Sequence, residues 1–420
     1  MKMKKSLTVA LILAMITSVG AAFAGGRDDG SRAGRTEIRW VEWKTPEVGD
    51  HVMERLRQAF NASQSEFYLT MIDRPFVGFH DNLIVQSQAR NLPEIVLAQV
   101  DWIGSFAREG IIQSIDPLVA QKPADFLDQF YDALIQRVNG RLYHLPLHSG
   151  SVAMFYCPVI FEREGLRPPT TWDELLDVSR RITGGGQFAQ TLTLGSEPPT
   201  NLTYDIYPLI LQAGGRIVDE NYMPAFNSPE GVRALEFYRE LVQFSVPGVL
   251  QNGETQKRQN FPQGNVAMMI EGPWGVGIQR GINPGRNFSI TTLPAGVTHG
   301  TIVRGSLLAL PTTTTGNRLE GAWQAMTFIA GPEGGAIYAE GGELPANRIV
   351  ANLPFVAANR DFDAFLAQME LPNAIALPHL PHQVELNRLF TIEVQHFIAG
   401  NKTAQQALDD AAARWIELLR

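Results

Sequence analysis

The segment Pro93-Glu94-Ile95-Val96-Leu97-Ala98 is a short apolar run of the kind that is buried in a parallel sheet. Upstream of it, the alternating side chains of residues 37–43 indicate a first strand, and residues 67–72 indicate a second. Amphipathic helices are expected between these strands, over residues 48–63 and 81–90. Strands and helices therefore alternate, which predicts an α/β layered fold.

The same alternation continues through the rest of the chain. Apolar runs predict further strands, and amphipathic spacing predicts further helices. The expected strands lie at residues 151–156, 266–270 and 306–310, and the expected helices lie at residues 172–181, 229–244, 317–330, 386–399 and 403–419.

Short polar residues mark the starts of three of these helices. Thr170 or Thr171, Ser228 and Thr403 can each accept a hydrogen bond from a backbone N–H of the first turn. Gly184-Gly185-Gly186 follows a helix and lacks the spacing of a nucleotide-binding fingerprint. We therefore expect a turn there and not a phosphate site.

The N-terminus has the three parts of a secretory signal peptide. Basic residues stand within the first five positions, an apolar run covers residues 7–19, and Ala22-Phe23-Ala24 provides a small-residue exit. The apolar run is shorter than the ~20 residues of a membrane-spanning helix, although an uncleaved anchor stays an alternative. We expect cleavage near Ala24 and a periplasmic product, and no cysteine near the exit is available for lipid attachment.

Composition and charge narrow the class of protein. A length of 420 residues favours two or three domains at ~150 residues each. The formal net charge of −8 argues against a nucleic-acid partner, because phosphates require a basic surface. The only cysteine, Cys157, cannot form an intrachain disulfide, and its apolar surroundings predict a buried thiol.

Six segments, in order along the chain from about Ile38, share a family signature. Together they resemble the extracellular solute-binding proteins of ABC importers, in the sugar-binding group that includes maltose-binding protein. One departure is Phe155-Tyr156-Cys157-Pro158, where that family has a Tyr-Tyr-Asn-Lys motif, so the local turn is in doubt there. The segments are Pro93-Glu94-Ile95-Val96 with Asp101-Trp102, residues 140–146, Pro168 to Leu175, Phe226 to Gly231, residues 264–274 and Gly341 to Ala346.

The resemblance implies a two-lobed periplasmic-binding-protein fold, type II-like, with a mixed sheet flanked by helices in each lobe and hinge crossovers between them. It assigns residues 1–24 to the signal peptide. Lobe one would hold residues 25–147 and a return segment, 304–353. Lobe two would hold residues 148–303 and the C-terminal helices, 354–420.

The function that the resemblance implies is capture of a sugar or oligosaccharide by hinge closure and delivery to the membrane subunits of an ABC importer. We expect a monomer without enzymatic activity, cofactor or metal. A glycerol-phosphate-type polyol ester is the alternative ligand. A receptor that hands its ligand to a membrane sensor would use the same fold and cleft, and the sequence does not separate it from a transport receptor. Less favoured is a glycoside hydrolase, for which Asp101 and Glu271 are the only loose carboxylate candidates.

Three sites follow the ends of predicted strands, where α/β sheets place their ligands. Trp274 is the first candidate, because an aromatic face can stack on the C–H face of a sugar. Asp101 could accept hydroxyl hydrogen bonds beside Trp102, or it could cap the next helix. Trp43 and Lys44 end the first strand, and Trp43 could instead cover the core.

Other candidates come from the resemblance. His148 and Ser149 lie at an expected hinge crossing, although His148 could simply pack there. Tyr204 lies where the family offers an aromatic side chain to the sugar. Gly305 lies at the return crossing, where a glycine lets the backbone approach closely. Arg348 could clamp a ligand, but a salt-bridged surface position is slightly favoured.

Overall fold

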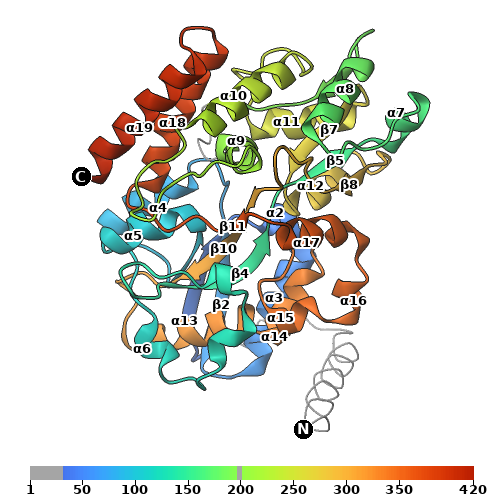
Figure 1. Cartoon of the computed structure of the whole chain (residues 1–420). Helices are drawn as coiled ribbons and strands as arrows, with labels where there is room; N and C mark the ends of the chain where they lie inside the picture. The colour runs from blue at the N-terminus through green and yellow to red at the C-terminus, as the bar shows by residue number, and fades with distance from the viewer. Residues whose placement is uncertain (1–31, 196–200) are drawn as a thin grey trace, which may run out of the picture.

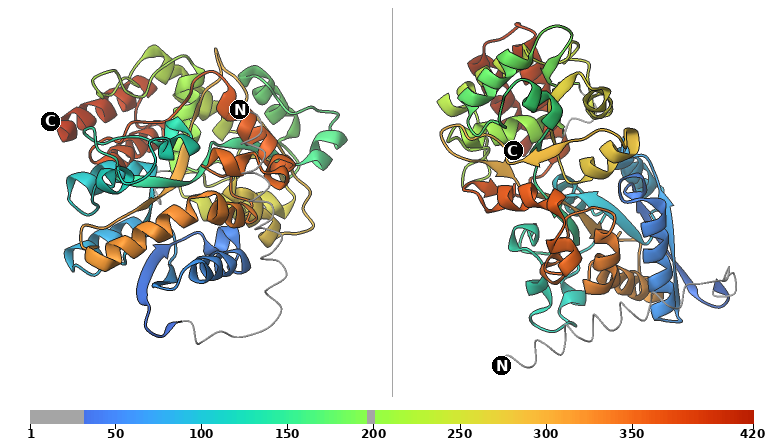
Figure 2. Two further views of the ribbon diagram at one scale, coloured as in Figure 1. Left: turned by 90° about the horizontal axis from the view of Figure 1, so that it is seen from below. Right: turned by 90° about the vertical axis from the view of Figure 1, so that its right-hand side faces the viewer.

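Two α/β bodies form the protein, one above the other in Figure 1 and again separated in the right-hand view of Figure 2. The computed structural model describes residues 32–195 and 201–420, without the side chains of residues 201–204. The expected signal peptide, residues 1–24, lies outside the described residues.

The lower body in Figure 1 is built on five strands from two separate stretches of sequence, residues 36–150 and 304–309. The strand order is β2-β1-β3-β10-β4. The first three strands run parallel, and β10 pairs antiparallel with both β3 and β4, so the sheet is mixed. The strands are β1 Thr36–Glu42, β2 Phe67–Asp73, β3 Ile95–Gln99, β4 His144–Gly150 and β10 Arg304–Ala309.

Helices cover this sheet because their apolar stripes pack on its buried side chains. In the helix of residues 50–63, Val52, Leu56 and Phe60 recur at helical spacing and join the same core as Trp40 and Leu97. The helices and 3-10 turns of this body are α2 Thr45–Val48, α3 Asp50–Ser63, α4 Phe79–Gln88, η2 Val100–Trp102, α5 Ile103–Arg108, α6 Asp116–Val119, η3 Phe126–Gln129, η4 Asp132–Leu134, α13 Gly316–Ile329 and α14 Pro332–Ala339.

The upper body contains a four-stranded mixed sheet in the order β6-β7-β5-β8. Its strands are β5 Ala153–Tyr156, β6 Phe188–Gln190, β7 Val266–Glu271 and β8 Ser289–Thr291. Its helices and turn are α7 Pro158–Arg163, α8 Trp172–Ile182, α9 Asn201–Gln212, α10 Pro229–Val242, α11 Glu254–Asn260, η5 Phe261–Gln263, α12 Trp274–Ile282, α18 Gln383–Ile398 and α19 Ala404–Leu419.

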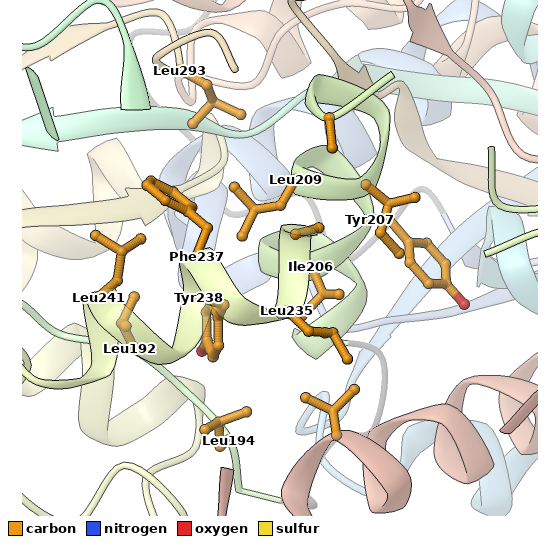
Figure 3. Packing of buried hydrophobic residues seen from close by; sticks show 14 of the residues in the cluster. Leu192, Leu194, Ile206, Tyr207, Leu209, Leu235, Phe237, Tyr238, Leu241 and Leu293 are labelled. Atoms are coloured by element: carbon orange, nitrogen blue, oxygen red, sulfur yellow. The ribbon is translucent and has the colours of Figure 1, made fainter. Parts of the chain in front are cut away.

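The core of the upper body lies between this sheet and its helices. Figure 3 shows Tyr207 and Leu209 of α9 beside Leu235 and Phe237 of α10. A separate core joins Phe155 to Ala336 and Ala339 of α14 and to the helices that follow residue 347. The remaining elements are β9 Thr301–Ile302, β11 Ala374–Ile375, α15 Arg348–Ala351, α16 Pro354–Ala357, η6 Arg360–Phe362 and α17 Asp363–Glu370.

The helix starts that the sequence marks are confirmed. Thr171 accepts a hydrogen bond from the Glu174 N–H at 3.2 Å, and Ser228 accepts one from the Gly231 N–H at 3.3 Å. Thr403 forms a reciprocal capping box with Gln406. Side-chain oxygens therefore satisfy first-turn donors that would otherwise lack partners.

The departure at Cys157-Pro158 has a local explanation. Cys157 is buried, as expected, and precedes α7 as its N-cap residue. Pro158 is the first residue of that helix, where a missing N–H costs nothing and the fixed φ suits the helix. The proline therefore ends the strand by starting a helix.

The triple glycine forms a turn, as expected, with backbone hydrogen bonds of 3.0 and 2.9 Å between Gly184 and Gln187.

The chain passes between the two sheets more than once. It leaves the larger sheet after β4 for β5, and it returns through β9 to β10. β10 pairs antiparallel with β4, with Arg304 opposite Gly150 and a register shift after Ser306, so the two crossings lie side by side. Two mixed sheets flanked by helices confirm the predicted fold class, while the residue boundaries of the two lobes stay a prediction.

Candidate functional site

A cleft of about 710 Å³ is lined by residues of both bodies. The lower body contributes α2 and the end of β2. The upper body contributes α11 and the start of α12, and the crossing strands β4 and β10 add their ends. Five of the predicted site residues line this cleft: Trp43, Lys44, His148, Trp274 and Gly305.

One wall of the cleft is aromatic. Trp43 and Phe76 both line it, with ring centroids 5.4 Å apart. Trp102 does not line the cleft but packs behind this pair, 5.4 Å from Trp43 and stacked on Phe76 at 6.2 Å. Trp43 is 4% exposed, so it both covers the core and contributes an edge to the cleft. The wall is therefore rigid, because each ring is held by another.

Lys44 places a buried cation at the base of the cleft. Its Nζ lies 2.8 Å from Glu343 Oε1 and also pairs with Glu47. Burial opposes the charge, but Glu343 and Glu47 outweigh it and raise the pKa of the Lys44 ammonium. The same ammonium lies 5.6 Å from the ring centroid of Trp274, which belongs to the other body.

A second charged group lines the upper body's side of the cleft. Lys257 Nζ lies 2.9 Å from Glu254 Oε1, and Arg258 Nε donates to Glu271 Oε2 at 2.8 Å. Burial would raise the pKa of Glu271, but Arg258 and Lys257 overcome that effect and lower it to about 2. The Glu271 carboxylate is therefore ionised at any ordinary pH.

The crossing strands supply polar groups to the cleft, among them His148, Ser306 and the charged Arg304. His148 Nε2 lies 2.8 Å from Ser306 Oγ, and burial lowers the pKa of the His148 imidazole well below its ordinary value. A Cβ on Gly305 would lie 2.3 Å from the His148 carbonyl oxygen, so close pairing of β10 with β4 requires glycine there. Ser149 lies one residue further along, where its hydroxyl donates to the Pro345 carbonyl at 3.1 Å.

The other predicted residues whose side chains the structure describes do not line the cleft. Asp101 lies in a small, mainly apolar pocket next to it, 3.5 Å from Asn387 Nδ2 of α18 and 3.8 Å from Arg304, and it makes no side-chain cap. Arg348 bonds the Phe130 carbonyl and Asp132, as the surface interpretation expects. Tyr204 lies in α9, and its side chain is outside the described part of the chain.

Several cleft residues were not predicted from the sequence. Phe76 follows β2, and the shared edge of parallel strands could have indicated it. Glu254, Lys257 and Arg258 lie on α11, a helix without a strong apolar stripe, and no sequence pattern brings them to the cleft. Glu47 lies on α2, just after Lys44, and shares the Lys44 ammonium with Glu343, which is far away in the sequence.

Two other structural findings bear on the predictions. Among residues 32–195 and 201–420, no cluster of three or more His, Cys, Asp or Glu side chains could hold a metal ion. Within that same part of the chain, no helix has both the length and the apolar character needed to cross a bilayer.

Comparison with known protein families identifies the family to which this chain belongs. The signature of the bacterial extracellular solute-binding protein family matches residues 66–336. The chain belongs to this family. Its members are binding proteins, in keeping with a cleft between two bodies.

Similar proteins span nearly the whole chain. A putative binding protein of Brucella abortus is 24% identical over 374 residues, covering 87% of this chain and 89% of its own. The galactooligosaccharide-binding protein of Bacillus subtilis is 23% identical over 432 residues, covering 98% and 97%. A solute-binding protein of Thermotoga lettingae, solved with α-D-tagatose, superposes with a TM-score of 0.82 at 24% identity and covers 92% of this chain and 100% of its own.

Proposed function

We propose that this protein captures an uncharged sugar or short oligosaccharide by closing its two bodies around it, and that it delivers the sugar to an ABC importer. Membership of the solute-binding family supports the binding role. The sugars named for the tagatose-bound Thermotoga protein and for the Bacillus galactooligosaccharide-binding protein support the ligand class.

The observation that carries this proposal is the make-up of the cleft. Trp43 and Phe76 offer aromatic surface from one body, and Trp274 offers it from the other. Sugar rings have apolar faces that stack on such surfaces and hydroxyl rims that need polar partners. A ligand held between surfaces of both bodies favours the closed state, which is the basis of hinge closure.

The charges of the cleft favour a neutral ligand over a phosphorylated polyol. Lys44, Lys257 and Arg258 already pair with the cleft-lining carboxylates of Glu47, Glu254 and Glu271. A phosphate would have to displace those carboxylates and leave them buried without partners, which is costly. Glycerol-phosphate esters are therefore the weaker candidates.

Binding without hydrolysis is the favoured role of the same cleft. A glycosidase needs one carboxyl with a raised pKa to act as the general acid. The pKa of Glu271 is lowered instead, and Asp101 faces a separate pocket, so neither of the two carboxyls that the sequence offered fits that role. Release of reducing ends from an oligosaccharide by the purified protein would contradict this part of the proposal.

A thermal-shift panel tests the proposal. The panel contains D-tagatose, maltose, galactooligosaccharides, glycerol 3-phosphate and a dipeptide. A sugar at a hundredfold its Kd should stabilise the fold by ~2.7 kcal/mol and raise the melting temperature. The variant Trp274→Ala should fold but lose most of that rise. A panel in which only glycerol 3-phosphate or the dipeptide raises the melting temperature would refute sugar binding.

A further inference from the structure

The end of β7 and the start of α12 bring a carboxylate against the indole of the cleft tryptophan. Glu271 is the last residue of the strand, and Trp274 is the first residue of the helix. The Trp274 Nε1–H donates to Glu271 Oε1 at 2.6 Å. The same oxygen accepts from the Gly272 backbone N–H at 3.0 Å. A hydrogen bond to an ionised acceptor is stronger than one between neutral groups.

The carboxylate is itself held from the other side. Glu271 Oε2 accepts from Arg258 Nε at 2.8 Å and lies 4.0 Å from Lys257 Nζ. Arg258 also lies 3.3 Å from Glu254, so the guanidinium is held between two carboxylates. The Glu271 side chain is 2% exposed. With both oxygens engaged, the carboxylate has little freedom to rotate.

The two glycines of this segment allow the close approach. A Cβ on Gly272 would lie 2.3 Å from the six-membered ring of Trp274. A Cβ on Gly275 would lie 2.2 Å from Glu271 Cγ. Neither position can carry a side chain without moving the ring or the carboxylate. The short segment Glu271-Gly272-Pro273-Trp274-Gly275 therefore encodes one orientation of the indole.

The orientation of the indole matters because the ring lies between groups of the two bodies. Trp274 lines the cleft from the upper body, while Lys44 of the lower body lies 5.6 Å from its ring centroid. His148 of the crossing strand lies edge-on to it at 6.5 Å. A ring that rotated about its side-chain bonds would lose these partners and present an edge in place of a face.

We propose that Glu271 is a positioning residue for ligand binding: it holds the Trp274 indole by its N–H so that the ring keeps one face toward the cleft, and Arg258 keeps Glu271 in place. The link to ligand affinity rests on the proposed function. The orientation of the ring does not, and it can be measured without a ligand.

The first test is the NMR signal of the Trp274 indole N–H in the whole protein. Its peak is identified by its loss in Trp274→Phe. In Glu271→Ala the peak should move upfield and its hydrogen exchange should become at least tenfold faster, because the bond to an ionised acceptor is gone. Glu271→Gln keeps an acceptor and should restore most of the wild-type position.

A matched control separates positioning from charge neutralisation. Glu254 pairs with the same two cations, Lys257 and Arg258, whereas the indole N–H donates to Glu271. Glu254→Gln should leave the Trp274 peak in place. The proposal is wrong if Glu271→Ala leaves the peak unchanged, or if Glu254→Gln moves it as far as Glu271→Ala does.

The second test is a double-mutant cycle of affinity with D-tagatose and a galactooligosaccharide mixture as probes. Glu271→Ala should weaken binding by about tenfold, the equivalent of one charged hydrogen bond. In the Trp274→Phe background, which lacks the N–H, the same change should have no further effect. Equal losses in both backgrounds would overturn the link to affinity. Failure of both probes to bind would instead contradict the proposed function, and the NMR result would still decide the role of Glu271.

Discussion

At the scale of single residues, two buried carboxyls of the upper body behave in opposite ways. Cations hold Glu271 ionised, as described above. Asp205 of α9 is 2% exposed, and its Oδ2 accepts from the Thr193 hydroxyl at 3.2 Å. Burial raises the pKa of Asp205 to about 7, and the more distant charge of Lys257 only partly opposes this. Asp205 is therefore a buried carboxyl that titrates near neutral pH.

This difference predicts a pH dependence of stability. The pKa of Asp205 is higher in the folded state than in the unfolded state, so its stabilising contribution is complete below about pH 4 and is lost as the pH rises to about 7. Asp205→Asn cannot ionise and should escape that loss. Urea unfolding should show the variant to be more stable than wild type by about 4 kcal/mol at pH 7.5, with no advantage at pH 4.

The control for this measurement is Asp177→Asn on α8, because the Asp177 side chain is 78% exposed. That variant should follow the wild-type profile at every pH. Parallel profiles for Asp205→Asn and wild type would show that burial of Asp205 has no such effect.

At the scale of elements, small residues decide where helices can pack closely. Gly321 lies on the buried side of α13, where a Cβ would be 2.3 Å from Phe67 Cδ1 and 2.7 Å from Ile38 Cδ1. Gly281 lies near the end of α12, where a Cβ would meet nothing within 4 Å. The same substitution should therefore have opposite effects in the two helices.

Gly321→Ala should destabilise the fold by about 1–3 kcal/mol, because the added methyl group overpacks the contact between α13 and the sheet. Gly281→Ala should stabilise it by about 0.5 kcal/mol, because alanine favours the helix and nothing obstructs its methyl group. Chemical unfolding at one pH measures both. A gain in stability for Gly321→Ala would contradict this prediction, because it would show that the contact between α13 and the sheet accommodates the methyl group.

At the scale of the whole molecule, the two bodies touch on more than one side. α2 of the lower body contacts α12 of the upper body beside the cleft, and a Cβ on Gly277 would lie 2.8 Å from the Glu47 carbonyl oxygen. Elsewhere, Asp101 of η2 meets Asn387 of α18. Closure of the bodies therefore depends on narrow spaces between helices as well as on the ligand.

A wedge between α2 and α12 should hold the bodies apart. Gly277→Phe places a ring where a Cβ already meets backbone, so it should weaken D-tagatose binding by at least about tenfold and increase the radius of gyration of the sugar-saturated protein in solution scattering. Gly281→Phe lies one turn further along the same helix in open space and is the matched control. Equal effects of both variants would place the cause in α12 itself and not in the contact.

The sequence by itself determined the order of strands and helices, three caps, the buried cysteine and the family. These features depend on local periodicity and on short motifs, which neighbouring residues carry. It also placed Trp43, Lys44, His148, Trp274 and Gly305 at strand ends and crossings that do line the cleft. Because strand ends share one edge of a sheet, the position of a residue at the end of a strand can be predicted from the sequence alone.

Only the tertiary structure decided which side chains meet. Lys44 and Glu343 are 299 residues apart and share one buried ion pair. Asp101 also follows a strand, but it lies in a separate small pocket against Asn387 of α18. The chain continues as a helix through Pro208, which a local rule would have taken as a break. Such contacts depend on how distant segments of the chain pack together, and no local sequence pattern predicts them.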